Sequence, residues 1–160
     1  MEQHIAELVT TMRKYQQTCK IEKQCLANVQ YLYDTIRMNF NVNVKAKAVM
    51  VYSYDSKLNQ TKIIIGHLVV LIEDSFIIDP SFDVFNLKNI KYFDNLNTFI
   101  NSYNIKNNYD VKTIIEEHLV FQELATRMNK NEIIISNKKY YNNIADFIAK
   151  THKSKYIIER

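Results

Sequence analysis

The chain has 160 residues, enough for one domain with a core of its own, and 47% of its residues are apolar and 24% charged. The net charge of +4 is spread along the chain rather than gathered in a basic block, so nucleic acid is not expected as the main partner. The sequence contains neither a run of 18 apolar residues nor an apolar signal-peptide core, so we expect no membrane span and a cytoplasmic location.

Two helices are predicted before the first strand. Apolar residues recur at helical spacing over residues 3–18 and again over residues 25–39. The polar residues 19–24 separate these two segments, which makes Cys25 the first residue of the second helix. We therefore expect Cys25 at a helix N-terminus, on the side that faces the core.

Strands are predicted next, over residues 44–54, 62–72 and 75–79, because β-branched and alternating apolar residues dominate these segments. Acidic and hydroxyl residues lie between the last two segments, which indicates a tight turn. These two strands are therefore expected to form an antiparallel hairpin.

The register of that hairpin decides whether two polar residues meet. If residues 73 and 75 face each other, His67 lies opposite Ser81, and Asp79 is its diagonal neighbour on the same face. A shift of one residue would put His67 and Asp79 on opposite faces. The sequence alone leaves this register open.

The rest of the chain is predicted to be mainly helical. Helical spacing recurs over residues 94–103, 110–128 and 137–150, and residues 132–136 read as a short strand. The order of helices, then strands, then helices predicts a single α+β domain over residues 1–160, with helices packed on a small antiparallel sheet.

Rare residue types mark one part of the chain. The single glycine, Gly66, precedes His67, and the single proline, Pro80, follows Asp79. Tryptophan is absent, whereas Asn, Lys, Ile and Tyr are abundant. This bias is typical of an AT-rich coding sequence, such as those of some large DNA viruses, phages or bacteria.

Cys25, His67 and Asp79 are the residue types that thiol catalysis needs. Such catalysis requires a cysteine held as thiolate, a histidine that exchanges its proton and a group that orients the imidazole. A helix N-terminus stabilises a thiolate, and Cys25 is predicted at one. His67 lies in an apolar strand, where a polar ring needs a partner, and Asp79 is the partner that strand alternation offers. Taken singly, Cys25 and His67 also fit a core, and Asp79 fits a turn.

Three segments resemble the transglutaminase-like branch of the papain-like superfamily: EKQCLANVQYLYDTI, VKAKAVMVYSY and GHLVVLIEDSFIIDPSFD. In that branch a cysteine opens a helix, a strand follows, and a histidine and an aspartate stand on neighbouring strands. The resemblance places a catalytic core at roughly residues 20–85, with residues 86–160 as a helical C-terminal part. The aromatic residue that often follows the histidine, and the glycine that usually precedes the cysteine, are missing here.

The resemblance implies a catalytic triad of Cys25, His67 and Asp79 and acyl transfer through a thioester on Cys25. We expect a cysteine peptidase or amidase-type hydrolase with a protein or peptide substrate, because the chain is short and has no further domain for a second substrate. A transglutaminase or acyltransferase with an amine acceptor is the alternative. In papain-like enzymes a glutamine upstream of the nucleophile helps to form the oxyanion hole, which implies Gln24 or Gln17.

No cofactor or metal is expected. The only cysteines, Cys19 and Cys25, lie six residues apart without the Cys/His partners of a zinc site, and we expect both to be free thiols. Asn28 is expected to pack or hydrogen-bond locally. His118 is expected to be a partly exposed helix residue, and His4 and His152, near the ends of the sequence, are expected to be solvated.

Two other classes of function stay open. The first is a non-catalytic interaction protein built on the same fold. The second is a basic module that binds nucleic acid or a host factor, which would require lysines to gather on one face, at positions 45, 47, 57 and 62.

Overall fold

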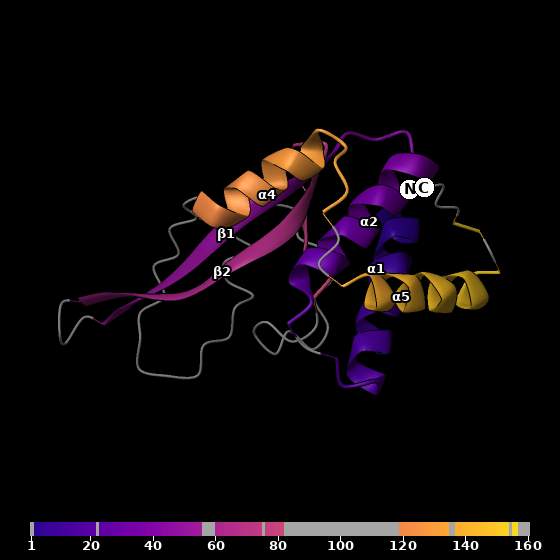
Figure 1. Ribbon diagram of the computed structural model, residues 1–160, viewed down its shortest axis with the longest axis horizontal. Helices are drawn as coiled ribbons and strands as arrows, with labels where there is room; N and C mark the ends of the chain where they lie inside the picture. Colours follow the sequence, from indigo (N-terminus) through magenta and orange to yellow (C-terminus); the bar gives the residue numbers. More distant parts are fainter. Residues whose placement is uncertain are drawn as a thin grey trace.

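The structure is a computed structural model that describes residues 2–21, 23–55, 60–74, 76–81, 119–134, 137–153 and 155–156. Within these residues the elements follow in the order α1 (Glu2–Thr18), α2 (Cys25–Asn39), β1 (Val44–Asp55), β2 (Gln60–Ile72), β3 (Phe76–Ile78), α4 (Leu119–Asn129) and α5 (Lys138–Thr151). Helices pack around an antiparallel sheet, so the fold class is α+β, as the sequence predicts (Figure 1).

The sheet has the strand order β1-β2-β3, and both neighbouring pairs are antiparallel. β1 and β2 form a long ribbon that runs from the pair Val44 and Ile72 to the pair Asp55 and Gln60. At one end of the ribbon the helices α1, α2 and α5 gather, and the other end extends away from them (Figure 1). Near the Ile72 end of the ribbon, the side chains of Ala46, Ala48, Leu68 and Val70 are buried.

The β2–β3 pairing shows the register that the sequence leaves open. Val70 pairs with Ile78. The same register, continued along the chain, places His67 opposite Ser81 and puts Asp79 on the face of His67 as its diagonal neighbour. The register is therefore the one that brings His67 and Asp79 together.

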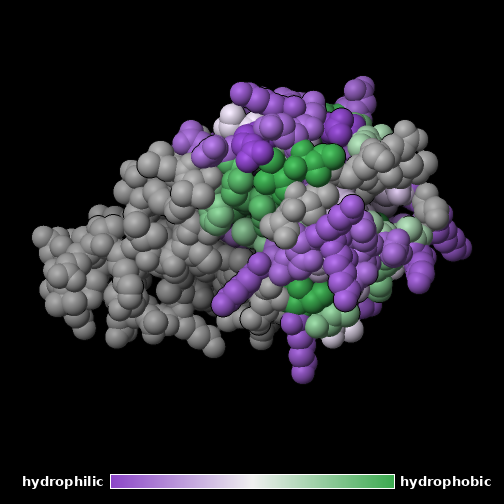
Figure 2. Space-filling view, in the orientation of Figure 1, coloured by the Kyte–Doolittle hydropathy of each residue, from purple (hydrophilic) through white to green (hydrophobic). Residues whose placement is uncertain are grey.

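Helix α2 lies at the centre of the core, and every residue from Ala27 to Ile36 is buried. It contacts β1, β2 and α5, while α5 also contacts α1. Helix α4 contacts β1 and β2, and Asn129 at its end holds the backbone of Ala46 by accepting from its N–H (2.7 Å) and donating to its C=O (3.0 Å). On the face shown in Figure 2, apolar residues reach the surface between hydrophilic areas.

The predicted strand at 132–136 is wrong for its described residues, because 132–134 have no regular structure. The N–H of Glu132 donates to the C=O of Arg127 at the end of α4, and the N–H of Ile134 donates to Oε1 of Gln30. These N–H groups have partners on helices, so they are not available to a neighbouring strand. Ile133 is 60% exposed, so its side chain does not belong to the core.

Two predicted helices lie wholly or partly outside the described residues. The segment 94–103 is not described, and of the predicted helix 110–128 the structure describes the part that forms α4. Helices α1, α2 and α5 begin and end within two residues of their predicted bounds. Within the described part of the chain, no helix combines the length and apolarity that crossing a membrane requires.

Candidate active site

His67 and Asp79 form a buried pair where the β2–β3 hairpin ends. The Nε2 atom of His67 lies 2.9 Å from Oδ2 of Asp79, and the two side chains are 1% and 0% exposed. β2 supplies His67, and Asp79 follows β3 directly. The register of the last paired residues directs both side chains to one face, where diagonal neighbours are within reach of long side chains.

The thiol of Cys25 lies on the other side of the imidazole. Cys25 is the first residue of α2, is partly exposed and is a free thiol, whereas Cys19 is an exposed free thiol. The Cys25 side chain hydrogen-bonds to His67 and interacts with its charge. Because Nε2 of His67 already bonds to Asp79, Nδ1 is the ring nitrogen left to face the sulfur. The structure thus brings Cys25, His67 and Asp79 together in that order.

The environment of His67 favours its charged form. Burial lowers the pKa of His67, but the carboxylate of Asp79 and the hydrogen bonds to Asp79 and Cys25 outweigh burial and raise the pKa to about 10. His67 is therefore an imidazolium at neutral pH, held between a carboxylate and a sulfur. A cation in this place stabilises a neighbouring thiolate.

Asp79 is held on both of its oxygens. Oδ2 bonds to His67, and Oδ1 accepts from the backbone N–H of Ser81 at 2.9 Å. A second cation, Arg13 of α1, is 5% exposed. Burial lowers the pKa of Arg13, and the charge of Asp79 opposes that shift. The carboxylate of Asp79 thus interacts with two buried cations, as expected for a charge taken out of water.

Other carboxylates near the hairpin do not compete for His67. Glu73 and Asp74 form the exposed tip, and each has a φ of 53°, in the left-handed region that reverses the chain. The N–H of Asn43 donates to Glu73 (2.9 Å), and Lys45 pairs with Asp74 (3.0 Å). Both carboxylates thus have partners outside the site.

The first turn of α2 has no side-chain cap, unlike that of α5. The residue before α2 is Gln24, which makes no capping hydrogen bond. At the start of α5, Asn137 accepts from the N–H of Tyr140. The unpaired N–H groups of a helix start carry partial positive charge and can bind a thiolate or an oxyanion. The backbone N–H of Cys25 is the expected donor here.

The glutamines named for the oxyanion hole lie in different settings. Gln24 is partly buried, and its Oε1 accepts from Nδ2 of Asn137 at 3.4 Å. Gln17 is exposed, while its neighbour Gln16 is fully buried and donates from Nε2 to the C=O of Pro80 at 2.7 Å. Gln16 is thus the buried glutamine of α1 that reaches the residue after Asp79.

Sequence reasoning missed the polar residues that surround Asp79. Asn28 was expected to pack or to hydrogen-bond locally, but its partners lie far away in the sequence: it donates from Nδ2 to Oγ of Ser81 (3.1 Å) and accepts from Tyr140 and Gln16. One signal was available, because Gln16 and Asn28 interrupt the apolar stripes of α1 and α2. A polar residue on a core stripe needs a buried partner.

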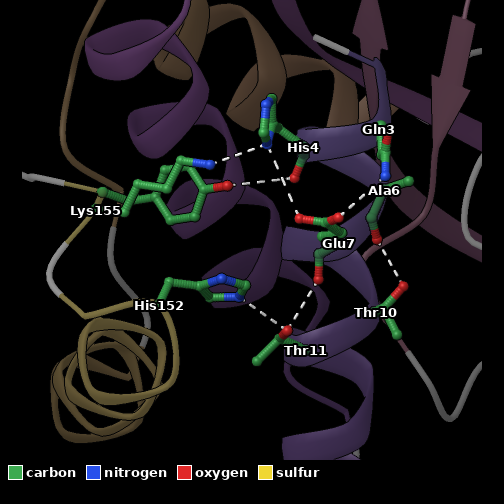
Figure 3. Close-up of polar contacts among 9 residues, drawn as sticks. Gln3, His4, Ala6, Glu7, Thr10, Thr11, His152 and Lys155 are labelled. Atoms are coloured by element: carbon green, nitrogen blue, oxygen red, sulfur yellow. Dashed lines mark hydrogen bonds and ion pairs between the residues drawn. The ribbon is translucent and has the colours of Figure 1, made fainter.

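Of the other histidines, the structure describes those at the two ends of the chain (Figure 3). His4 is exposed, as expected. His152 is not fully exposed: it is half-buried, and its Nε2 lies 3.0 Å from Oγ1 of Thr11, because the end of α5 packs against α1. The hydroxyl of Thr11 also donates to the C=O of Glu7, so Thr11 links His152 to the backbone of α1. His118 lies outside the described residues.

Metal and nucleic-acid functions gain no support from the residues that the structure describes. These residues include no group of three or more histidine, cysteine, aspartate or glutamate side chains that could hold a metal ion. Of the lysines considered for a basic face, Lys45 is paired with Asp74, and the side chains at 57 and 62 lie outside the described residues. Comparisons with protein-family models, curated proteins and solved structures found no match.

Proposed function

We propose that the chain is a thiol-dependent acyl-transfer enzyme of papain-like or transglutaminase-like type. Cys25 is the nucleophile, His67 carries the proton, and Asp79 orients His67. One observation supports this most: a buried histidine bonds on one nitrogen to a buried carboxylate and interacts on its other side with a partly exposed thiol at a helix start. This arrangement supports the roles of nucleophile, base and orienting group for the three side chains.

The reaction follows from the charges of the resting site. The Cys25 sulfur attacks the carbonyl carbon, forming a C–S bond and a tetrahedral oxyanion that backbone N–H groups at the start of α2 stabilise. The oxyanion collapses, the C–N bond breaks, and the proton of His67 passes to the leaving nitrogen. Water then attacks the thioester while neutral His67 takes a proton from it. The acid leaves, and the thiolate and imidazolium are restored.

A hydrolase acting on protein or peptide substrates in the cytoplasm is the preferred form of this proposal. Water as the acceptor needs no second substrate beside the thioester. An amine acceptor would give a transglutaminase or acyltransferase through the same thioester. Gln24, next to Cys25, is the side chain proposed to assist the backbone in the oxyanion hole.

A non-catalytic interaction protein on this fold is the second candidate, and the burial of the pair supports it. His67 and Asp79 are almost completely excluded from solvent, as in an ion pair that only holds a fold. Under this reading the partly exposed Cys25 thiol has no chemical role. The two candidates therefore differ in whether Cys25 can be acylated.

Intact-mass spectrometry after mixing with activated esters and peptide thioesters tests the proposal. We expect a mass increase of one acyl group on Cys25, followed by its loss to water or to an added amine. Cys19→Ala is the matched control and should still acylate, whereas Cys25→Ala should not. If the acyl group appears on Cys19 or on neither cysteine, the interaction protein is the better reading.

A further inference from the structure

Side chains of two helices hold the segment that carries Asp79. Gln16 of α1 donates to the C=O of Pro80 (2.7 Å), and Asn28 of α2 donates to Oγ of Ser81 (3.1 Å). The N–H of Ser81 in turn donates to Oδ1 of Asp79 (2.9 Å). The residues 79–81 follow β3 without pairing in the sheet, so these bonds replace strand pairing in fixing their position.

Asn28 is the centre of this arrangement. Its Oδ1 accepts from Nε2 of Gln16 (3.2 Å) and from the hydroxyl of Tyr140 in α5, and its Nδ2 donates to Ser81. All four side chains are at most 5% exposed. Two donors on the oxygen and an acceptor on the nitrogen determine which way the amide points. An amide that cannot flip presents a fixed donor to Ser81.

We propose that Asn28 is a positioning residue for Asp79, and that Tyr140 sets its orientation from α5. The relay Tyr140–Asn28–Ser81 keeps the Ser81 N–H on one oxygen of Asp79, which leaves the other oxygen aimed at His67. The packing of α5 on α2 then controls how well Asp79 orients the imidazole. This inference rests on the proposed thiol chemistry, and it adds α5 to the parts of the molecule on which that chemistry depends.

A network that only stabilises the fold would be as buried as the relay. The molecule contains a second buried network that serves as a control for this possibility. The next residue of α5, Tyr141, is 3% exposed and donates to Oδ2 of Asp34 in α2 at 2.6 Å. Tyr140 and Tyr141 are thus neighbouring buried tyrosines, each with a hydroxyl that bonds to a buried polar side chain of α2. Of the two, Tyr140 bonds to the residue that holds Ser81.

The variants Tyr140→Phe and Tyr141→Phe distinguish an effect on the position of Asp79 from an effect on the stability of the fold. Each removes one buried hydroxyl, and each should lower the urea midpoint by a similar amount. Tyr140→Phe should also slow Cys25 alkylation by roughly 2- to 10-fold, the range expected for one lost hydrogen bond. It should lower the pH at which the His67 ring titrates by NMR, because Asp79 is aimed less well. Tyr141→Phe should leave both readouts at their wild-type values.

Asn28→Ala should have the larger effect of the same kind, because it removes the centre of the relay. The His67 titration needs no substrate and no reactive thiol, so the relay can be tested even if the proposed function fails. Equal effects of Tyr140→Phe and Tyr141→Phe on His67 and Cys25 would overturn the relay. If wild-type Cys25 reacts no faster than Cys19 while Tyr140→Phe alone shifts His67, the relay stands and the proposed function fails.

Discussion

Two buried polar clusters join α2 to α5, and only one of them reaches a thiol. In the first, the relay from Tyr140 through Asn28 leads to Asp79, which bonds to His67. In the second, the two oxygens of Asp34 accept from Tyr141 (2.6 Å) and from Gln30 (3.0 Å). The clusters are alike in burial, in helices of origin and in the presence of a doubly bonded aspartate.

The clusters differ in the groups at their ends. The second ends at the backbone N–H of Ile134, which donates to Gln30, and so it holds the loop after α4. Burial raises the pKa of Tyr141 well above its usual value, so its hydroxyl stays protonated near neutral pH. The first ends at His67 and Cys25, an imidazole and a thiol whose side chains hydrogen-bond to each other. A buried, hydrogen-bonded cluster therefore indicates a site only when it includes groups that can exchange a proton.

Replacing the aspartate of each cluster should give the largest difference in the acylation rate of Cys25. Asp79→Asn leaves one acceptor oxygen for two donors, His67 Nε2 and Ser81 N–H, and removes the counter-charge of the imidazolium. In a serine triad the corresponding change costs about 10⁴ in rate, and we expect a loss of that order in the acylation rate of Cys25. Asp34→Asn should leave that rate unchanged, although it removes an acceptor of the same kind.

Urea denaturation of both variants provides the control for folding. Each should lose about 1–3 kcal/mol of stability, because each leaves a buried donor poorly matched. A similar loss of acylation in Asp34→Asn and Asp79→Asn would mean that both act through general stability. In that case the distinction between the two clusters would be wrong.

A smaller effect should appear in the pH dependence of stability. Burial lowers the pKa of His67, but Asp79 and Cys25 outweigh burial and raise it from 6.5 to about 10. Because the pKa of His67 is raised in the folded state, protonated His67 stabilises the fold. This stabilisation is complete below about pH 6.5 and is lost as the pH rises toward about 10. We expect a loss on the order of 1 kcal/mol per pH unit in this window, measured by urea denaturation.

His67→Gln is the matched variant for this measurement. It should be less stable than wild type near neutral pH and should show a much flatter decline toward alkaline pH. The measurements should stop below about pH 9.5, because unfolded tyrosines ionise near 10 while burial raises the pKa of Tyr31 to about 12 in the fold. A wild-type decline that persists in His67→Gln would show that other groups cause it.

Local sequence patterns were sufficient to predict the helices and strands that position the site. Helical spacing located α2 and put Cys25 at its start, and β-branched residues located β2. The contact between His67 and Asp79 needed one further fact, the hairpin register, because a shift of one residue changes the face of every side chain. The sequence restricted that contact to a few alternatives, and the structure shows which one forms.

The surroundings of Asp79 could not be predicted, because they depend on how distant helices pack. Asn28 and Tyr140 lie 112 residues apart, and no spacing rule connects them. The strand prediction for this part of the chain was wrong at 132–134 for a similar reason. Its apolar residues suit a strand, but the N–H of Ile134 donates to Gln30 of α2. Long-range side-chain bonds to the backbone override local propensity at such positions.

The most direct test of the account compares the two thiols of one molecule. Brief treatment with iodoacetamide near neutral pH, followed by peptide mass spectrometry, gives the alkylation rates of Cys25 and Cys19 under identical conditions. We predict that the partly buried Cys25 reacts faster than the exposed Cys19, because the His67 imidazolium and the start of α2 place positive charge beside its sulfur. Equal rates, or faster labelling of Cys19, would contradict the assignment of Cys25 as the nucleophile.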